Sequence, residues 1–468
     1  MAVARNYIDF EHYGQINDGI YRDRGLAQSF PVVLPVIICF KLFGIGILQG
    51  RLSSILYSIG LLFVSYFFAK KVFNKKVAVL NLILLVFSGL PIHFLLVSVQ
   101  ILGENAMLFY LLSGYLLIAS DSQSKNIINR NFILAIFCFT FGIFAKSQIS
   151  PFLLFSFLTC AAIASLKGNF YLFIRYAALA IFPPVVVLLF SVLNGIFHVF
   201  PGELVRPVED LAKYTVLVWD WNSKVEALLV MIIFVLPSIY ASIYFVSSKL
   251  KYYKNYKSLD EYLYIFSYAL ICFSWLSWYL LFSTAWTRYL YPTAVLMTVF
   301  LAWAIVDLNY FTSFKRFSQF LKDISAFSSE NIKAWLVYFL IPIFCHGIIQ
   351  SCYTMYEELQ DTNSSLIETA NFLNSHKNID NIETYESELF FILEKAYHFP
   401  PDTLNVETLR RRIHPDYQLT YVWDSDKYPY LVIGPYARGF QYYSNSKEKI
   451  EKSRLIFDNQ RYQVYSFE

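Results

Sequence analysis

The chain has 468 residues, of which 57% are hydrophobic and only 15% are charged. Soluble domains carry about 25% charged residues, so this balance excludes an ordinary soluble domain and predicts a protein with many membrane-spanning segments. The net charge of +4 is small and no nucleic-acid motif is present, so we expect no nucleic-acid partner. The six cysteines all lie in or beside apolar runs without a CxxC pair, which favours buried thiols over disulfides.

The first distinctive feature is a short polar segment over residues 7–16, which reads YIDFEHYGQI and precedes a long apolar chain. It contains Asp9, Glu11 and Tyr13. Carboxylates at the mouth of a membrane protein are costly to hold against hydrocarbon, so they need a functional reason to be there. Asp9 is the first candidate for a general base and Glu11 the second. The alternative is that both are ordinary solvated charges.

The next segment, residues 31–48, is apolar but contains Lys41, and it begins with two prolines, Pro31 and Pro35. These features favour a helix that lies in the membrane interface rather than one that spans it. The other interpretation is that residues 31–48 cross the membrane and leave the acidic segment cytoplasmic. That arrangement requires an almost immediate turn at residues 49–50.

The following apolar runs are each about as long as a bilayer core requires, and together they predict about ten spanning helices. They cover residues 52–69, 77–94, 105–119, 132–146, 151–166, 173–197, 226–247, 261–282, 289–306 and 335–352.

The segments that join these runs alternate in charge. One set is rich in lysine and arginine, as in residues 70–76 and 249–257, and the positive-inside rule places it in the cytoplasm. The other set contains Glu104, Lys146 and Arg288 and falls outside. This alternation puts the acidic N-terminal segment outside as well, in an outer loop over residues 1–50 that also contains the interfacial helix. We therefore expect a first spanning helix to be missing from this chain.

Composition changes after residue 353. The polar residues 354–468 predict a small extracytoplasmic α/β domain, whereas residues 1–353 form the membrane domain. Helices are predicted over residues 366–373 and 406–412, and a buried strand over 430–433. Residues 453–457 and 462–465 predict a terminal hairpin.

Six short motifs then occur in a fixed order along the chain. They are Asp9-Phe10-Glu11-His12-Tyr13, Pro31-Val32-Val33-Leu34-Pro35 with Leu42-Phe43-Gly44, Gly50-Arg51-Leu52-Ser53-Ser54, Gly103-Glu104, Ala145-Lys146-Ser147 and Arg288-Tyr289-Leu290-Tyr291-Pro292. In this order and spacing the chain resembles, over residues 5–310, the C-type glycosyltransferases (GT-C). The resemblance is to the branch of protein O-mannosyltransferases and lipid A aminoarabinose transferases, the bacterial family-39-like enzymes. Phe10 stands where that family often has a second acid.

The resemblance implies a GT-C-like fold in the cell membrane and a sugar donor built on a polyprenyl phosphate. It implies Asp9 as general base, with Glu11 second, and Glu104 as a group that orients the acceptor or assists the base. The phosphate would be bound by Lys146 and Arg288, with Arg51 third, and Tyr13 and Tyr289 would join the substrate site. The acceptor would be a lipid, a glycan or a protein on the outer face. Inversion at the anomeric carbon is also implied.

Other interpretations of these residues stay open. Glu104 also suits the first turn of a helix, where the helix dipole favours an acid, and Lys146 and Arg288 also suit span ends, where basic side chains snorkel. The seven histidines show no metal-binding spacing, so no metal site is predicted, although Asp9, Glu11 and Glu104 are types that bind a divalent cation. The alternative functions are a transporter or flippase for a lipid-linked sugar, and an inactive scaffold of the same fold. The apolar runs lack mid-span charges and the chain lacks a repeat, which favours the enzyme.

Overall fold

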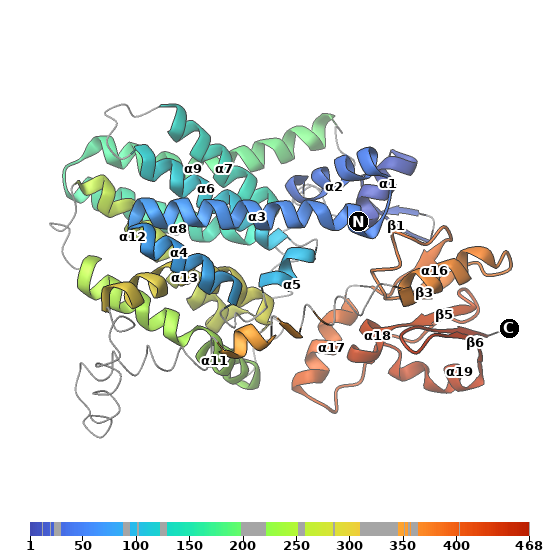
Figure 1. Ribbon diagram of the computed structural model, residues 1–468. Helices are drawn as coiled ribbons and strands as arrows, with labels where there is room; N and C mark the ends of the chain where they lie inside the picture. The colour runs from blue at the N-terminus through green and yellow to red at the C-terminus, as the bar shows by residue number, and fades with distance from the viewer. Residues whose placement is uncertain are drawn as a thin grey trace, which may run out of the picture.

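The computed structural model describes residues 1–468 except 12, 19, 23–29, 88–93, 101–102, 122–128, 198–220, 251–257, 284–285, 309–344, 351, 354–355, 357–363, 402 and 468. Figure 1 shows two parts, a bundle of long helices and a smaller part that combines helices with a sheet. The bundle is formed by residues before 309, and the smaller part by residues after 363. The fold is therefore mostly helical with a small C-terminal sheet, as predicted.

The helical part contains twelve α-helices among the described residues before 309, and residues 345–350 are also helical. The twelve helices are α1 (Ala2–Phe10), α2 (Phe30–Phe43), α3 (Ile47–Val72), α4 (Lys75–Phe87), α5 (Phe94–Val99), α6 (Gly103–Asp121), α7 (Arg130–Ala145), α8 (Ser150–Leu166), α9 (Phe170–Phe197), α11 (Trp221–Phe245), α12 (Leu259–Phe282) and α13 (Thr287–Leu308). A 3₁₀ turn, η2 (Ser147–Ile149), links α7 to α8, and a π turn, η3 (Val246–Leu250), extends α11. A small hairpin, β1 (Gln15–Asn17) with β2 (Ile20–Arg22), follows α1.

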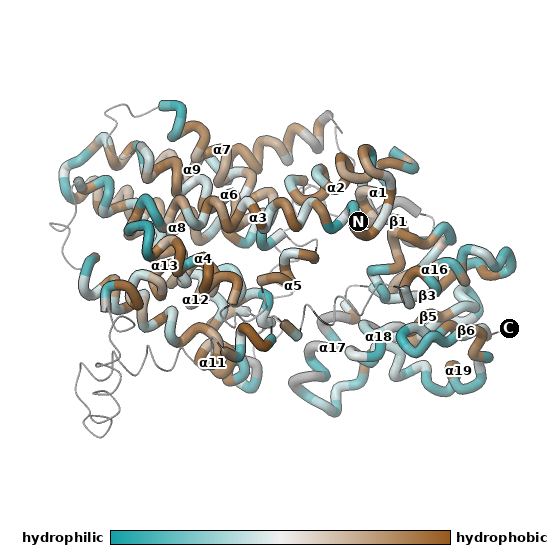
Figure 2. Tube along the Cα trace, viewed as in Figure 1, coloured by the Kyte–Doolittle hydropathy of each residue, from teal (hydrophilic) through white to brown (hydrophobic). Residues whose placement is uncertain are grey.

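Six of the described helices are long and apolar enough to cross a membrane, namely α3, α9, α12, α13, α8 with its preceding turn, and α11 with its following turn. Their apolar residues run along nearly the whole length of the bundle in Figure 2. Most of α13 is buried inside the protein whereas most of α9 is not, so α13 is a central helix and α9 a peripheral one. The predicted run 335–352 lies largely outside the described residues.

Two predicted spans differ in extent from the helices observed. The run predicted over residues 77–94 holds α4, which ends at Phe87, and the start of a separate short helix, α5. At 13 residues α4 is about 20 Å long, which is less than the roughly 30 Å of a bilayer core. The span predicted to begin at Leu52 begins at Ile47 instead. Gly50 and Arg51 are therefore helical, because one glycine does not outweigh the strong helix formers on either side.

The acidic N-terminal segment was predicted to be a polar loop, and this was wrong for residues 7–10. They form the last turn of α1, and Glu11, which follows the helix, is in the left-handed region with φ 55°. The helix forms because Val3, Ala4 and Asn6 share one face, which is buried. That face packs on α2, so tertiary packing overrides the polar appearance of the segment.

The C-terminal part is built on a five-stranded mixed sheet in the order β4-β3-β5-β7-β6. Strand β3 pairs in parallel with β4 and β5, and the other pairings are antiparallel. The strands are β3 (Ile382–Thr384), β4 (Tyr397–His398), β5 (Tyr430–Ile433), β6 (Arg454–Asp458) and β7 (Gln463–Ser466), and the helices are α16 (Ser364–Ser375), α17 (Thr403–Ile413), α18 (Pro435–Phe440) and α19 (Lys447–Lys452). The predicted helices, buried strand and terminal hairpin are confirmed, whereas β3 and β4 were not predicted.

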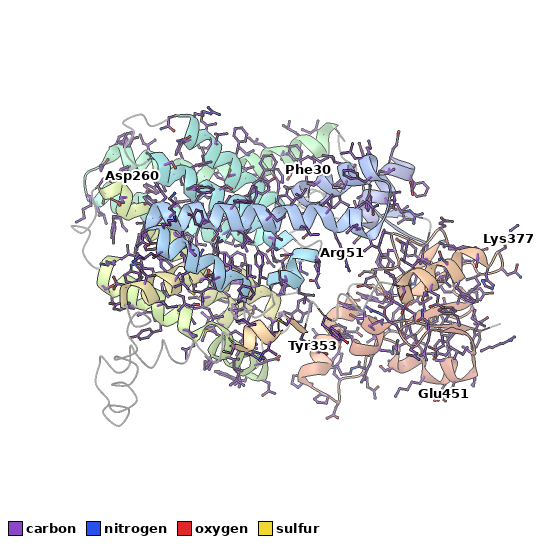
Figure 3. The ribbon with its side chains drawn as sticks, in the orientation of Figure 1. Phe30, Arg51, Asp260, Tyr353, Lys377 and Glu451 are labelled. Atoms are coloured by element: carbon purple, nitrogen blue, oxygen red, sulfur yellow. The ribbon has the colours of Figure 1, made fainter. Side chains whose placement is uncertain are left out.

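The two parts meet at α1 and α2. Side chains of these helices and Phe391 of the C-terminal part form one buried apolar cluster, which includes Val33, Val36 and Phe40. Figure 3 labels Arg51 at the end of the bundle that is nearest the C-terminal part and Asp260 at the opposite end. The lysine-rich turn between α3 and α4 lies at the same far end as Asp260 (Figure 1).

Candidate active site

A buried carboxylate with two cations lies where three helix ends meet. Glu104 is in the first turn of α6, Lys146 follows the last residue of α7, and Arg288 is the second residue of α13. Lys146 Nζ lies 2.5 Å from Glu104 Oε1. Arg288 Nε donates to the same oxygen, and Arg288 Nη2 lies 3.4 Å from Glu104 Oε2. The structure therefore brings together three of the residues that the sequence singled out.

The backbone at Gly103 allows this meeting. Gly103 begins α6 and lies against the carbonyl group of Ala145, the last residue of α7. A Cβ atom at position 103 would overlap the Ala145 carbonyl oxygen, so only glycine lets the two helix ends come this close. The close approach places Glu104 directly beside Lys146.

The cluster has an excess of positive charge and free hydrogen-bond donors. Glu104 is only 1% exposed, while the side chain of Lys146 is 11% and that of Arg288 42% exposed. Both Glu104 oxygens are occupied by the cations, but Arg288 Nη1 has no partner among the described residues. Two cations and one carboxylate leave a net charge of +1 at a partly open surface. Such an arrangement can bind an anionic group, and phosphate in particular suits an arginine fork.

Aromatic rings cover one side of the cluster. Lys146 Nζ lies 5.7 Å from the centre of the Tyr289 ring, within the range of a cation–π contact. Tyr289 in turn stacks on Trp286 and meets Trp278 edge to face, with ring centres 5.7 and 5.6 Å apart. Trp275 Nε1 donates to the Tyr289 carbonyl oxygen at 2.8 Å, which fixes the start of α13. These tryptophans were not predicted, although the Thr-Ala-Trp-Thr-Arg sequence before α13 placed Trp286 beside the site.

A series of hydrogen bonds between buried polar side chains links three helices next to the cluster. Asn105 is buried and accepts a hydrogen bond from the Tyr291 hydroxyl at 2.8 Å, and its Nδ2 donates to Ser58 Oγ, also at 2.8 Å. These three residues belong to α6, α13 and α3. Neither Asn105 nor Ser58 was predicted as a site residue. The sequence contained one signal for Asn105, because it is a polar residue in an apolar run and directly follows Glu104.

The N-terminal acids make no contact with the Glu104 cluster among the described residues. Asp9 Oδ2 pairs with Arg5 Nε at 2.9 Å, one helical turn away, and this is its one ion pair among the described residues. Glu11 is exposed at the end of α1. Tyr13 is buried, which raises the pKa of its phenol. No contact joins Asp9 to Glu104 within the described residues, so the predicted convergence of all four charged residues is found for Glu104, Lys146 and Arg288 only.

Two predicted residues remain. Tyr289 belongs to the Glu104 cluster through its contact with Lys146. Arg51 is the fifth residue of α3. Among the described residues, no group of three or more His, Cys, Asp or Glu side chains gathers as a metal site would require. Asp9 and Glu104 are each held by cations, so their placement does not fit a shared divalent ion.

The fold, an α-helical membrane domain that carries a small C-terminal sheet, is similar to that of known membrane-protein structures. Two similar solved structures are those of ArnT from Cupriavidus metallidurans. The structure bound to undecaprenyl phosphate has a TM-score of 0.58 at 11% identity, and the apo structure 0.56 at 12%. Each match covers 100% of this chain and 92% of that protein. The oligosaccharyltransferase AglB from Archaeoglobus fulgidus also matches, with a TM-score of 0.48 and 69% of its own chain covered. No protein-family model and no curated protein sequence matches this chain.

Proposed function

We propose that this protein is a membrane glycosyltransferase that moves a sugar from a polyprenyl-phosphate donor to an acceptor on the outer face of the cell membrane. The observation that carries the proposal is the pair of cations, Lys146 and Arg288, held by the one buried carboxylate of Glu104. The ArnT fold adds support, because one ArnT structure holds undecaprenyl phosphate.

In this proposal Lys146 and Arg288 bind the donor phosphate. Arg288 offers its Nη1, which has no partner among the described residues, and Lys146 offers its remaining N–H groups. Glu104 is then a positioning residue, since both of its oxygens accept hydrogen bonds from the cations and neither is left to take a proton. This differs from the sequence-based expectation that Glu104 assists the base or orients the acceptor. The cations would stabilise the charge that develops on the phosphate as it leaves.

Asp9 is the proposed general base. An acceptor hydroxyl attacks the anomeric carbon, the bond from that carbon to the phosphate oxygen breaks, and the hydroxyl proton passes to the Asp9 carboxylate. Asp9 is at the exposed end of α1, where its carboxylate is accessible. A single displacement of this kind inverts the anomeric centre and needs no covalent intermediate with the enzyme.

The distribution of charge supports the assignment of the reaction to the outer face. The lysine-rich turn between α3 and α4 lies at the end of the bundle away from the C-terminal part. Because positive loops favour the cytoplasm, this orientation would place the C-terminal part outside, along with α1 and Arg51.

The experiment uses the purified full chain in liposomes with radiolabelled polyprenyl-phosphate sugars and an envelope lipid and glycan extract as acceptor. We expect release of polyprenyl phosphate coupled to acceptor labelling, and a loss of about 100-fold or more in Glu104→Gln. The matched control is Glu448→Gln, an exposed acid on α19. Movement of intact donor between leaflets without release of polyprenyl phosphate would instead identify a flippase.

A further inference from the structure

A cavity of about 270 Å³ lies between α1 and the C-terminal part, and none of its lining residues belongs to the Glu104 cluster. Arg5, Asn6 and Phe10 contribute its wall on the α1 side. Phe390, Ala396 and Tyr397 contribute the opposite wall, from the segment that leads into β4 and its first residue. Two parts of the chain that are almost 400 residues apart therefore enclose one space.

Two polar atoms of residues that line this cavity, Tyr397 Oη and Asn6 Oδ1, make no hydrogen bond with the described residues. Tyr397 is 8% exposed, and its hydroxyl makes no hydrogen bond there. Asn6 is 5% exposed; its Nδ2 donates to the Gly14 carbonyl oxygen at 2.8 Å, but its Oδ1 accepts from no described residue. Neither atom is shut off from solvent, so the Tyr397 hydroxyl can donate to, and Asn6 Oδ1 can accept from, a ligand that enters the cavity. Burial raises the pKa of Tyr397, so the phenol stays protonated and can donate.

The rest of the wall is aromatic. Phe390 and Tyr397 stack in parallel with ring centres 4.6 Å apart. Phe10, one helical turn beyond Asn6, is an exposed aromatic ring at the same cavity. Aromatic faces beside a few precisely placed hydrogen-bonding groups suit a neutral ligand that has both C–H surfaces and hydroxyl groups.

The cations at the cavity are already satisfied. Arg5 donates to Asp9 and to the Phe391 and Leu393 carbonyl oxygens, at 2.9, 2.8 and 2.8 Å. Lys395 Nζ lies 3.0 Å from the His376 carbonyl oxygen and 3.6 Å from Asp380. With both cations used, the cavity lacks the free positive charge that a phosphate or carboxylate ligand requires.

We propose that this cavity binds one neutral pyranose ring of the acceptor, through the Tyr397 hydroxyl, Asn6 Oδ1 and the aromatic wall. The proposal rests on the proposed function, because it makes the acceptor a sugar-bearing molecule. The cavity volume of about 270 Å³ leaves room for a single ring. Arg5, which lines the cavity, also holds Asp9, so a bound acceptor would lie beside the proposed base.

The test is a binding measurement on the full-length protein in nanodiscs, which needs no donor. Saturation-transfer NMR is recorded with methyl glucoside, methyl mannoside, methyl galactoside and N-acetylglucosamine, and with glucose 1-phosphate. We expect at least one neutral sugar to bind, and glucose 1-phosphate to bind no better than methyl glucoside. Tyr397→Phe, which keeps the ring and its stacking, should weaken binding about tenfold. Ala396→Trp should fill the cavity and abolish it.

Tyr465→Phe is the matched control, because it removes a phenol from the same sheet at a position remote from the cavity. The proposal is overturned if no neutral sugar binds, if Ala396→Trp leaves binding intact, or if only the phosphorylated sugar binds. Failure of this proposal is separate from failure of the proposed function. If Ala396→Trp loses sugar binding but still transfers sugar to the extract, the cavity takes no part in the reaction. If the unaltered protein binds sugar but shows no transfer activity, the proposed transferase function is wrong.

Discussion

Arg5 and Leu393 lie 388 residues apart in the chain, yet the Arg5 guanidinium donates to the Leu393 carbonyl oxygen at 2.8 Å. The same group donates to the Phe391 carbonyl oxygen and, through Nε, to Asp9. Arg5 thus fixes the proposed base and the C-terminal part to one another. The orientation of Asp9 depends on how this part docks on α1.

Replacing Arg5 by lysine should weaken the contact between α1 and the C-terminal part. A lysine keeps the charge but cannot serve two carbonyl groups and a carboxylate from one planar fork. We expect hydrogen exchange in residues 389–397 to speed up by about tenfold, because hydrogen bonds from a charged donor contribute about 1.5–3 kcal/mol. Arg130→Lys, an exposed arginine at the start of α7, is the control. Unchanged exchange in residues 389–397 would show that the apolar cluster alone maintains this contact.

Asp9→Asn should abolish transfer while the protein stays folded. The amide cannot accept the acceptor proton, whereas the lost ion pair with Arg5 lies at the surface and contributes less than about 1 kcal/mol. Turnover is measured by release of polyprenyl phosphate, and folding by the melting temperature in detergent. Glu11→Gln, two residues away and exposed, should retain activity. Full turnover in Asp9→Asn together with loss in Glu11→Gln would transfer the base role to Glu11.

Arg288→Lys should weaken donor binding more than it slows the chemical step. Lysine keeps one charge but loses the second N–H toward Glu104 Oε2 and the free Nη1 that we assign to phosphate. We expect the donor KM to rise about tenfold, and kcat at saturating donor to fall less. Arg454→Lys, exposed on β6, provides the comparison. A donor KM equal to that of the unaltered protein would argue against a phosphate contact at Arg288.

Gly103→Ala should disturb the site through the backbone. The added methyl group overlaps the Ala145 carbonyl oxygen, so the ends of α6 and α7 must separate and Glu104 moves away from Lys146. We expect a loss of about 1–3 kcal/mol in stability and a loss of activity. Gly439→Ala, where a methyl group meets nothing within 4 Å, should change neither. Wild-type activity in Gly103→Ala would show that the close approach is not required.

The sequence predicted those elements whose patterns are local. Strand β5 is a continuous apolar run ending at Gly434-Pro435, and its predicted bounds of 430–433 match those observed. Strand β3 was missed because it is three residues long and contains Glu383, which reads as a surface acid. Glu383 is nevertheless fully buried, because His398 and Tyr421, distant in sequence, bind its two oxygens. Partners of this kind leave no signature in the segment itself.

The candidate site also combines residues that the sequence indicated with contacts that it did not indicate. Glu104, Lys146 and Arg288 were selected by motif order, and the structure joins them, although their roles remain predictions. The pairing of Asp9 with Arg5 was not predicted, because the N-terminal segment was interpreted as a loop. In a loop, residues four apart in the sequence are not expected to be neighbours. Once the segment is a helix, the two side chains are neighbours.

The Glu104 cluster also has a consequence for biosynthesis. Glu104 and Lys146 are 42 residues apart, but Arg288 comes 184 residues after Glu104. A nascent chain therefore inserts the carboxylate and the lysine long before the ribosome supplies the arginine. Until α13 enters the membrane the half-built cluster has no net charge, so the capacity to hold an anion arises only when its last central helix is in place.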